Sequence, residues 1–531
     1  MKSRMAGLML QVSPLEPCFR QLNEYFMHNT PDLLSAPVQI QFALISHTNA
    51  GKTTLARTLM GLDVGEVRDA PHVTSLSESH TLLQSAAGDQ LILWDTPGFG
   101  DSVRLSKRLG MADNPIGWFL REVLDRYVDR PFWLSQQALR TAREAADVVL
   151  YLVNSSEDPH DAGYLAPEMA ILQWLGKPVV ILLNQMGAPR PHQEESAELQ
   201  RWQTYLVRYP VVQKVIALDA FARCWVHERV FYDAVAALIS SDKQAAYARL
   251  FDTWRQENES RFCAAMDLIA QQIIQAGQDT EAIEVAQGAL LGTVLKVIGL
   301  DKEREQKRQE QALAQLTQRL NDSVLATTSG LLKLYRLDAG AAGKINERVH
   351  RHYVVRAPVD ARQAGLFGAM LSGAATGLSA DLMAGGLSFG AGALVGGILG
   401  ALSFAGAAWA FNATTDRKHP QLQFSDEFLR SLLVAALLRY LAVAHFGRGR
   451  GNFAEGESPA FWQDEVEAAI ADKHDVLKSA WQAGRDELVQ TENLALVANA
   501  RTSLSLLLVA VTRQILGKLY PQVPGLDKDC A

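Results

Sequence analysis

The 531-residue sequence contains few cysteines and no excess of basic residues. The cysteines are far apart and form no C-x-x-C pair, so neither a disulfide framework nor a zinc site is predicted; they are Cys18, Cys224, Cys263 and Cys530. Lys and Arg total 51 against 58 for Asp and Glu, a net charge of −7, so DNA is not an expected partner. Before Pro14 the apolar run is very short, which predicts no secretory signal. The scattered cysteines suit a reducing cytoplasm, so we expect a cytoplasmic location with an association with the inner membrane left open.

Residues 38–240 alternate short apolar runs with helical segments. This alternation predicts an α/β domain with a mainly parallel sheet covered by helices on both faces. The candidate strands are 38–46, 90–95, 147–154, 177–184 and 212–219. The connection at about 99–140 is long and is expected to carry a helical insertion. Residues 1–37 are interpreted as an N-terminal extension.

From about residue 243 to 350 the composition changes, and the second half of the chain contains long stretches without Gly or Pro, such as 243–274 and 304–326. Their apolar spacing is typical of helices. We therefore expect a helical domain at 241–362 and a C-terminal helical region at 414–531. The chain is predicted to be an α/β domain followed by a mostly α-helical region.

Residues 363–413 are rich in Gly and Ala, and Asp381 is their only charged residue. Two helices, at 363–380 and about 387–411, would be long enough to cross a bilayer as a hairpin, and basic residues flank the segment. One interpretation is a hairpin that contacts inner-membrane lipid or a membrane protein. The other is a tightly packed hairpin buried in the C-terminal domain, because Gly and Ala give little hydrophobicity. The sequence leaves both open.

The segment SHTNAGKTT, residues 46–54, follows the first candidate strand and is typical of a phosphate-binding loop. Gly51 allows close approach of the backbone, Lys52 reaches the terminal phosphates, and Thr53 supplies a hydroxyl to Mg²⁺. Ser46 stands where such loops carry their first glycine, and we expect it to be tolerated. The predicted nucleotide contacts in this loop also include Asn49, Ala50 and Thr54.

A second motif, DTPG at 95–98, ends the next apolar strand. Asp95 would hold the Mg²⁺ shell through water, and the Gly98 N–H would sense a γ-phosphate. Between the two motifs, Thr74 lies in a polar loop and is placed to complete the metal shell. Histidines near the site, including His47, show no spacing for a metal cage and are interpreted as ordinary loop residues.

Together, SHTNAGKT, Thr74 and DTPG resemble the signature of Era-like P-loop GTPases of the translation-factor class. The whole chain is also similar to a poorly characterised bacterial GTPase family, through NAGKTTLARTL, DTPGFGD, an LDAF–R–W element at 218–225 and the Gly/Ala-rich segment. Members of that family carry a C-terminal domain of unknown function. The resemblance implies GTP and GDP as ligands, Mg²⁺ as cofactor and hydrolysis of GTP, but it implies no cellular role.

The guanine-reading motif N-K-x-D is incomplete, because the corresponding strand ends in NQMG. Asn184 is present, while Gln185 replaces the lysine and Gly187 replaces the aspartate. A missing buried hydrogen-bonding partner costs about 1–3 kcal/mol, so discrimination against adenine is expected to weaken. Asp219 is a hypothetical substitute for the lost carboxylate. An ATPase therefore remains an alternative.

Phe99 follows DTPG where Ras-like enzymes carry a water-orienting glutamine, which predicts slow intrinsic hydrolysis. Asn49 matches the asparagine of K⁺-activated Era-like members, so K⁺-stimulated hydrolysis completed by a G-domain homodimer is our hypothesis. The leading interpretation is a GTPase switch that acts on the helical half. The alternative is a membrane-interacting structural protein with a nucleotide-binding but nearly inactive G domain.

Overall fold

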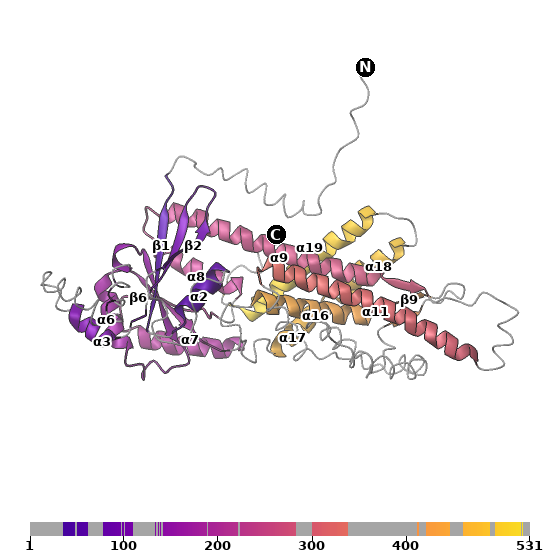
Figure 1. The fold of residues 1–531 in the computed structure, drawn as a ribbon, viewed down its shortest axis with the longest axis horizontal. Helices are drawn as coiled ribbons and strands as arrows, with labels where there is room; N and C mark the ends of the chain where they lie inside the picture. The colour runs from indigo at the N-terminus through magenta and orange to yellow at the C-terminus, as the bar shows by residue number, and fades with distance from the viewer. Residues whose placement is uncertain are drawn as a thin grey trace, which may run out of the picture.

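The structure is a computed structural model, shown in Figure 1, and it describes residues 36–47, 50–61, 78–96, 98–99, 101–109, 133, 136, 139, 142–187, 190–220, 224–282, 300–337, 411–413, 421–445, 460–488, 494–521 and 523. Several predicted features lie outside these residues: Asn49, Thr74, most of the insertion expected at 99–140, and residues 363–410 of the Gly/Ala-rich segment.

The N-terminal half contains a six-stranded sheet in the order β2-β3-β1-β4-β5-β6. Its strands are β1 (Gln39–Ser46), β2 (Glu78–Gln84), β3 (Gln90–Asp95), β4 (Val148–Asn154), β5 (Val179–Asn184) and β6 (Val212–Ala217). All neighbours are parallel except β2, which pairs antiparallel with β3. The five predicted strands are present. The edge strand β2 was missed, because its sequence ESHTLLQ lacks the continuous apolar run of a strand covered on both faces.

Helices cover both faces of this sheet, as the sequence predicts. Side chains of β1 alternate between the two layers: Ile40, Phe42 and Leu44 join one core, while Ala43 and Ile45 join the other. The first layer contains α2 (Lys52–Met60) and α8 (Trp225–Ala236). The second contains α3 (Ser102–Leu109), α6 (Leu165–Leu175) and α7 (His192–Leu206).

The C-terminal half is largely helical and is organised around the 35-residue helix α9 (Gln244–Gln278). Among the described helices of this half, four pack against α9, and they come from both sides of the Gly/Ala-rich segment: α11 (Leu300–Leu334), α16 (Asp426–Ala444), α18 (His474–Leu488) and α19 (Leu494–Leu519). The helix α17 (Ala460–Ala471) packs on α16 and α19. A small antiparallel sheet is formed by β7 (Thr280–Ala282), β9 (Gln421–Phe424) and β8 (Phe411–Ala413).

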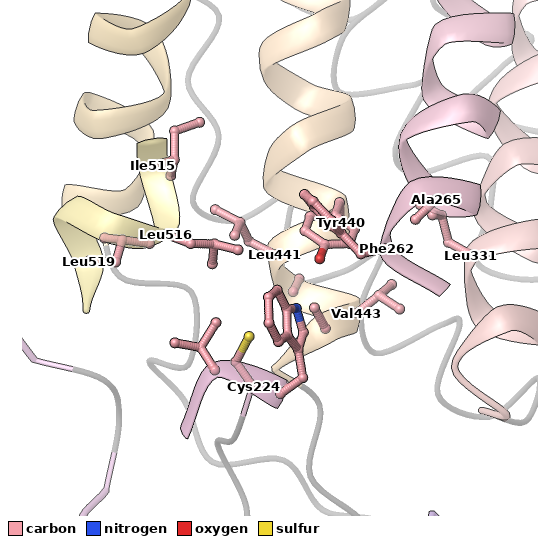
Figure 2. Close-up of a cluster of buried hydrophobic side chains, with 14 of the residues drawn as sticks. Cys224, Phe262, Ala265, Leu331, Tyr440, Leu441, Val443, Ile515, Leu516 and Leu519 are labelled. Carbon is pink, nitrogen blue, oxygen red and sulfur yellow. The ribbon is translucent and has the colours of Figure 1, made fainter. Parts of the chain in front are cut away.

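The two halves share one hydrophobic core. The helix α9 runs alongside β2 and β3 before it enters the helical bundle (Figure 1). At its start Arg249 binds the buried Asp89 of the β2–β3 turn at 2.7 Å, and Lys243 binds Asp147 at 2.8 Å. Figure 2 shows Cys224, at the first turn of α8, among side chains of the bundle such as Tyr440. The helical half is therefore packed directly onto the sheet domain.

One helix within the described residues is long and apolar enough to cross a membrane, namely Ala498–Leu519 of α19. Half of this window (50%) is buried, and α19 packs along α9. A core helix of a folded domain has the same length and composition, so this feature is weak support for a membrane span.

Candidate functional site

The phosphate-binding loop connects β1 to α2. Ser46 is the last residue of β1 and is fully buried, and Gly51 is the residue before the first turn of α2. Gly51 has φ +91°, and a Cβ atom there would lie 2.6 Å from the Asn184 side-chain nitrogen. Only glycine suits this position, because the conformation is left-handed and the space is already filled. The first N–H groups of any helix have no partner within the helix, so the N-terminus of α2 suits an anion at this loop.

Lys52 lies in the first turn of α2 and points back to β1, where its Nζ donates to Ser46 Oγ at 3.0 Å. Burial lowers the pKa of the Lys52 ammonium, and the carboxylates of Asp95 and Glu168 oppose this decrease. Ser46 thus serves as a hydrogen-bond acceptor for the lysine, in addition to ending the strand. The substitution of serine for glycine is compatible with an ordered lysine in this loop.

The predicted magnesium ligands Thr53 and Asp95 are brought together. Asp95 ends β3, beside β1 in the sheet, and the Thr53 hydroxyl donates to Asp95 Oδ2 at 2.7 Å. A hydroxyl and a carboxylate oxygen are the hard oxygen ligands that Mg²⁺ takes beside phosphate, so these residues fit the ion. Nearby, the Thr96 hydroxyl donates to the Leu44 carbonyl at 2.7 Å and secures the strand end. Thr54 is buried on α2.

The segment after DTPG is tied to the phosphate-binding loop through the backbone. The Phe99 N–H donates to the Ser46 carbonyl at 3.0 Å, and Phe99 pairs with His47 in a parallel bridge. The Phe99 side chain is fully buried in the second core, so it has a packing role. Gly98 precedes Phe99 in the chain and is buried, and its contact with a γ-phosphate stays a prediction.

The base-binding side is organised by Asn184, at the end of β5. Its side-chain nitrogen donates to the Ala50 carbonyl at 2.8 Å, and its oxygen accepts from the Ala220 N–H at 2.8 Å. One buried amide therefore joins the phosphate-binding loop to the loop after β6. The backbone of the next two residues is also distinctive: Gln185 has φ +58°, and the Met186 N–H donates to Asp219 Oδ2 at 2.6 Å.

A buried carboxylate beside the phosphate-binding loop was not predicted from the sequence. Glu168, in the first turn of α6, accepts from His47 Nδ1 at 2.7 Å and from the Tyr151 hydroxyl of β4. Burial raises the pKa of Glu168, while hydrogen bonds from His47, Tyr151 and Ser102 oppose the increase. His47 also stacks on Tyr164, with ring centroids 4.2 Å apart. His47 is therefore a fixed part of the site and not an ordinary loop histidine; its partner is 121 residues away, so local sequence gave no signal.

Comparisons with known proteins agree with this geometry. A family model described as a 50S ribosome-binding GTPase matches residues 41–185, and one described as a domain of unknown function (DUF3482) matches residues 211–499. The chain thus carries a GTP-binding P-loop GTPase domain, followed by a largely helical region.

Solved structures that are similar to the chain include Era of Aquifex aeolicus bound to GDP and AlF4⁻ (15% identity, 48% of this chain and 75% of that chain, TM-score 0.29). Another is the GTP-analogue-bound NFeoB from S. thermophilus (16% identity, 44% and 71% coverage, TM-score 0.22). A third is the chloroplast translocon pair atToc33 and psToc159 (11% identity, 43% and 90% coverage, TM-score 0.25). We base no functional argument on these distant structures.

Proposed function

Because the chain belongs to the family defined by the domain of unknown function (DUF3482), which here follows a P-loop GTPase domain, we propose that it is a magnesium-dependent GTPase that acts as a switch on its helical half. The observation that carries the proposal is the 2.7 Å contact between Thr53 and Asp95, next to the buried Lys52. Lys52 and Thr53 come from the first turn of α2 and Asp95 from the end of β3, and they provide the ligands and the cation that a magnesium-bound triphosphate requires.

In the proposed mechanism the chain contributes position and charge. Lys52 and the backbone around Gly51 hold the phosphates, and Thr53 and Asp95 would hold Mg²⁺, which neutralises phosphate charge when bound. Thr74 completes the metal shell, and the Gly98 N–H senses the γ-phosphate. Multiple-turnover GTP hydrolysis by the purified chain tests this proposal. Turnover should disappear in Lys52→Ala and in excess EDTA; activity that survives both changes would refute it.

Selectivity for guanine is proposed to depend on Asp219 in place of the aspartate missing from NQMG. Asp219 lies just after β6, and its bond to the Met186 N–H holds the carboxyl group against the NQMG turn. A carboxylate can accept hydrogen bonds from both N1–H and the 2-amino group of guanine. An asparagine would keep one acceptor and present one donor, which suits xanthine, where an oxygen replaces the 2-amino group.

Asp219→Asn should therefore weaken GTP binding at least tenfold and improve binding of xanthosine triphosphate, because a lost charged hydrogen bond costs about 1.5–3 kcal/mol. Glu195→Gln is a matched control, since Glu195 is a nearby half-buried carboxyl whose Oε1 accepts from the Arg190 N–H. Unchanged preference for GTP over the xanthine nucleotide in Asp219→Asn would assign guanine recognition to other groups.

Hydrolysis is proposed to be slow in the isolated chain and stimulated by K⁺ together with G-domain dimerisation. The support is the buried Phe99, which leaves the usual water-orienting position without a polar side chain, and Asn49 in the phosphate-binding loop. Turnover in KCl should exceed turnover in NaCl at equal ionic strength, and Asn49→Ala should remove the difference. Equal rates in the two salts would contradict the K⁺ proposal.

Coupling to the helical half is proposed to pass through the walls of one cavity, of about 140 Å³. Gly61 and Leu82, on either side of the loop that carries Thr74, line it on the G-domain side. Trp254 of α9 and Val443 of α16 line it on the helical side. When a triphosphate draws the Thr74 loop towards the metal, the segments on either side of that loop would shift and change their packing against α9 and α16.

Membrane association is proposed from the Gly/Ala-rich segment alone, residues 363–413. A hairpin there would anchor an otherwise cytoplasmic chain to the inner membrane. Alkaline-carbonate extraction of membranes tests this: an integral hairpin keeps the protein in the pellet. Complete release into the supernatant would rule it out.

A further inference from the structure

The cavity between the G domain and the helical half is lined by charged side chains as well as by apolar ones. Its described lining includes two carboxyl groups and two guanidinium groups, which belong to Glu228, Glu257, Arg261 and Arg336. Equal numbers of acidic and basic groups around a small space do not suit an anion or a cation alone. They suit a ligand that carries one charge of each sign, because each charge then finds an opposite partner.

The guanidinium group of Arg261 is held in a fixed orientation. Its Nη1 donates to Asn258 Oδ1 at 2.9 Å, and the group lies over the Tyr335 ring, 5.6 Å from the centroid. Asn258 is buried and is itself fixed, since its Nδ2 donates to the Trp254 carbonyl at 2.9 Å. Within the described part of the chain, Arg261 makes no further hydrogen bond and no ion pair. An oriented guanidinium with unused donors can bind a carboxylate through two parallel hydrogen bonds.

Carboxyl groups reach the cavity from two helices. Glu228 of α8 is half-buried and is fixed there, because its Oε2 accepts from Trp254 Nε1 at 3.0 Å. Glu257 lies one turn before Arg261 on α9, and among the described residues no ion pair joins the two. An ammonium group in the cavity would therefore find carboxylate partners on both α8 and α9.

The size and the remaining walls of the cavity limit what it can hold. Cavities that bind drug-sized ligands measure about 300–1,000 Å³. This cavity measures about 140 Å³, so it suits a molecule of the size of an amino acid and not a nucleotide. Its apolar wall includes Leu82 of β2 and Val443 of α16, and burial of a hydrocarbon side chain against them would be favourable.

We propose that this cavity binds a free α-amino acid with an apolar side chain, which acts as an effector of the G domain. The carboxylate of the amino acid pairs with Arg261, and its ammonium group lies between Glu228 and Glu257. Its side chain faces Leu82 and Val443. Binding at this site requires no nucleotide.

Occupancy of the cavity would be linked to the nucleotide state. Gly61 follows the last turn of α2 and Leu82 lies in β2, so the wall includes both segments that flank the Thr74 loop. An amino acid that prefers one arrangement of this wall changes the affinity for GTP, and GTP changes the affinity for the amino acid by the same factor. This regulatory step rests on the proposed GTPase function.

Calorimetric titration of the full chain without nucleotide tests the site, with L-leucine as the probe. Isocaproate, which is leucine without its amino group, and isoamylamine, which is leucine without its carboxyl group, are the matched ligands. We expect leucine to bind at millimolar concentration or below, and each analogue to bind at least tenfold more weakly, because each loses charged hydrogen bonds. Absence of leucine binding at millimolar concentration would overturn the proposal. Isocaproate that binds as tightly as leucine would overturn it too.

Two arginine variants of α9 locate the site. Arg261→Met keeps a long side chain but removes the guanidinium, so leucine affinity should fall at least tenfold. Arg255→Met is the matched control and should leave leucine affinity unchanged, because Arg255 binds Asp252 at 2.9 Å and is not part of the described lining. Equal leucine affinity in the two variants would overturn the proposal. If Arg261→Met does not fold, the three ligands titrated into the wild type decide.

Titration of GTPγS with and without saturating leucine tests the regulatory step. We expect GTPγS affinity to change by about fivefold or more, the lower end of coupling between allosteric sites. Unchanged GTPγS affinity would overturn the regulatory step. A wild type that binds leucine but no guanine nucleotide would refute the proposed GTPase function and support the binding site. A wild type that binds GTPγS but not leucine would refute this inference alone.

Discussion

Asn184 offers a direct test of how the nucleotide site is held together, because one buried side chain connects its two loops. Asn184→Ala would remove the donor to the Ala50 carbonyl and the acceptor for the Ala220 N–H. Each buried polar group left without a partner costs about 1–3 kcal/mol, so the folded G domain should lose about 2–6 kcal/mol. Every 1.4 kcal/mol by which the binding conformation of the phosphate-binding loop is destabilised weakens nucleotide affinity about tenfold. We expect GDP affinity to fall by at least that factor.

The neighbouring strand provides a matched control. Asn154 ends β4 and pairs in register with Asn184, but its side-chain oxygen accepts only from the adjacent turn, including the Ser156 N–H at 3.1 Å. Asn154→Ala should lower stability by about 1 kcal/mol and leave GDP affinity unchanged. Fluorescent GDP titration and urea unfolding of both variants provide the two measurements. If Asn184→Ala bound GDP as tightly as Asn154→Ala does, the bridging role of Asn184 would be refuted.

Three further predictions concern single side chains. Gly51→Ala should reduce GDP affinity at least tenfold, because the added Cβ would lie 2.6 Å from the Asn184 side-chain nitrogen. Gly61→Ala is the control: its added Cβ would have no neighbouring atom within 4 Å, so the variant should only lose about 1 kcal/mol of stability from its left-handed backbone. Arg439 is fully buried, burial lowers its pKa to about 10, and no described residue hydrogen-bonds its guanidinium. Arg439→Leu should therefore raise stability by about 1–4 kcal/mol in urea unfolding, and a loss would reveal an anionic partner. Burial alone would raise the pKa of Asp89, but hydrogen bonds from Arg249, Ser85 and the Val38 N–H lower it. The contribution of Asp89 to folding stability is therefore present above the usual aspartate pKa, and it is lost as the pH falls through the lowered pKa of the folded protein. The urea midpoints of wild type and Asp89→Asn should converge below about pH 4, and a constant difference would contradict this.

The sheet could be predicted well from the sequence where strands are covered on both faces. QLILWD forms β3 with the expected bounds, and VVILLN lies within the expected strand. The edge strand β2 could not be found, because it begins with four consecutive polar residues, ESHT, which resemble a loop. Long helices without Gly or Pro, such as α9, were also expected from their apolar spacing.

The candidate site was predictable only where residues lie close together in the sequence or follow a known motif. Lys52, Thr53 and Asp95 belong to such motifs, and the structure brings them together. The roles of Glu168 and of the Ala220 backbone depend on contacts between distant segments, so the sequence carried no signal for them. Asp219 lies between these cases: its position after a strand suggested a role, and its contact with Met186 was visible only in the structure.

Calorimetric titration of the purified chain with GTPγS, GDP and an ATP analogue, at millimolar Mg²⁺, tests the central claim most directly. We predict that both guanine nucleotides bind, that GTPγS requires Mg²⁺ and Lys52, and that the adenine nucleotide binds at least tenfold more weakly. Failure of both guanine nucleotides to bind, or binding of the adenine nucleotide with equal affinity, would contradict the assignment of this chain as a GTPase.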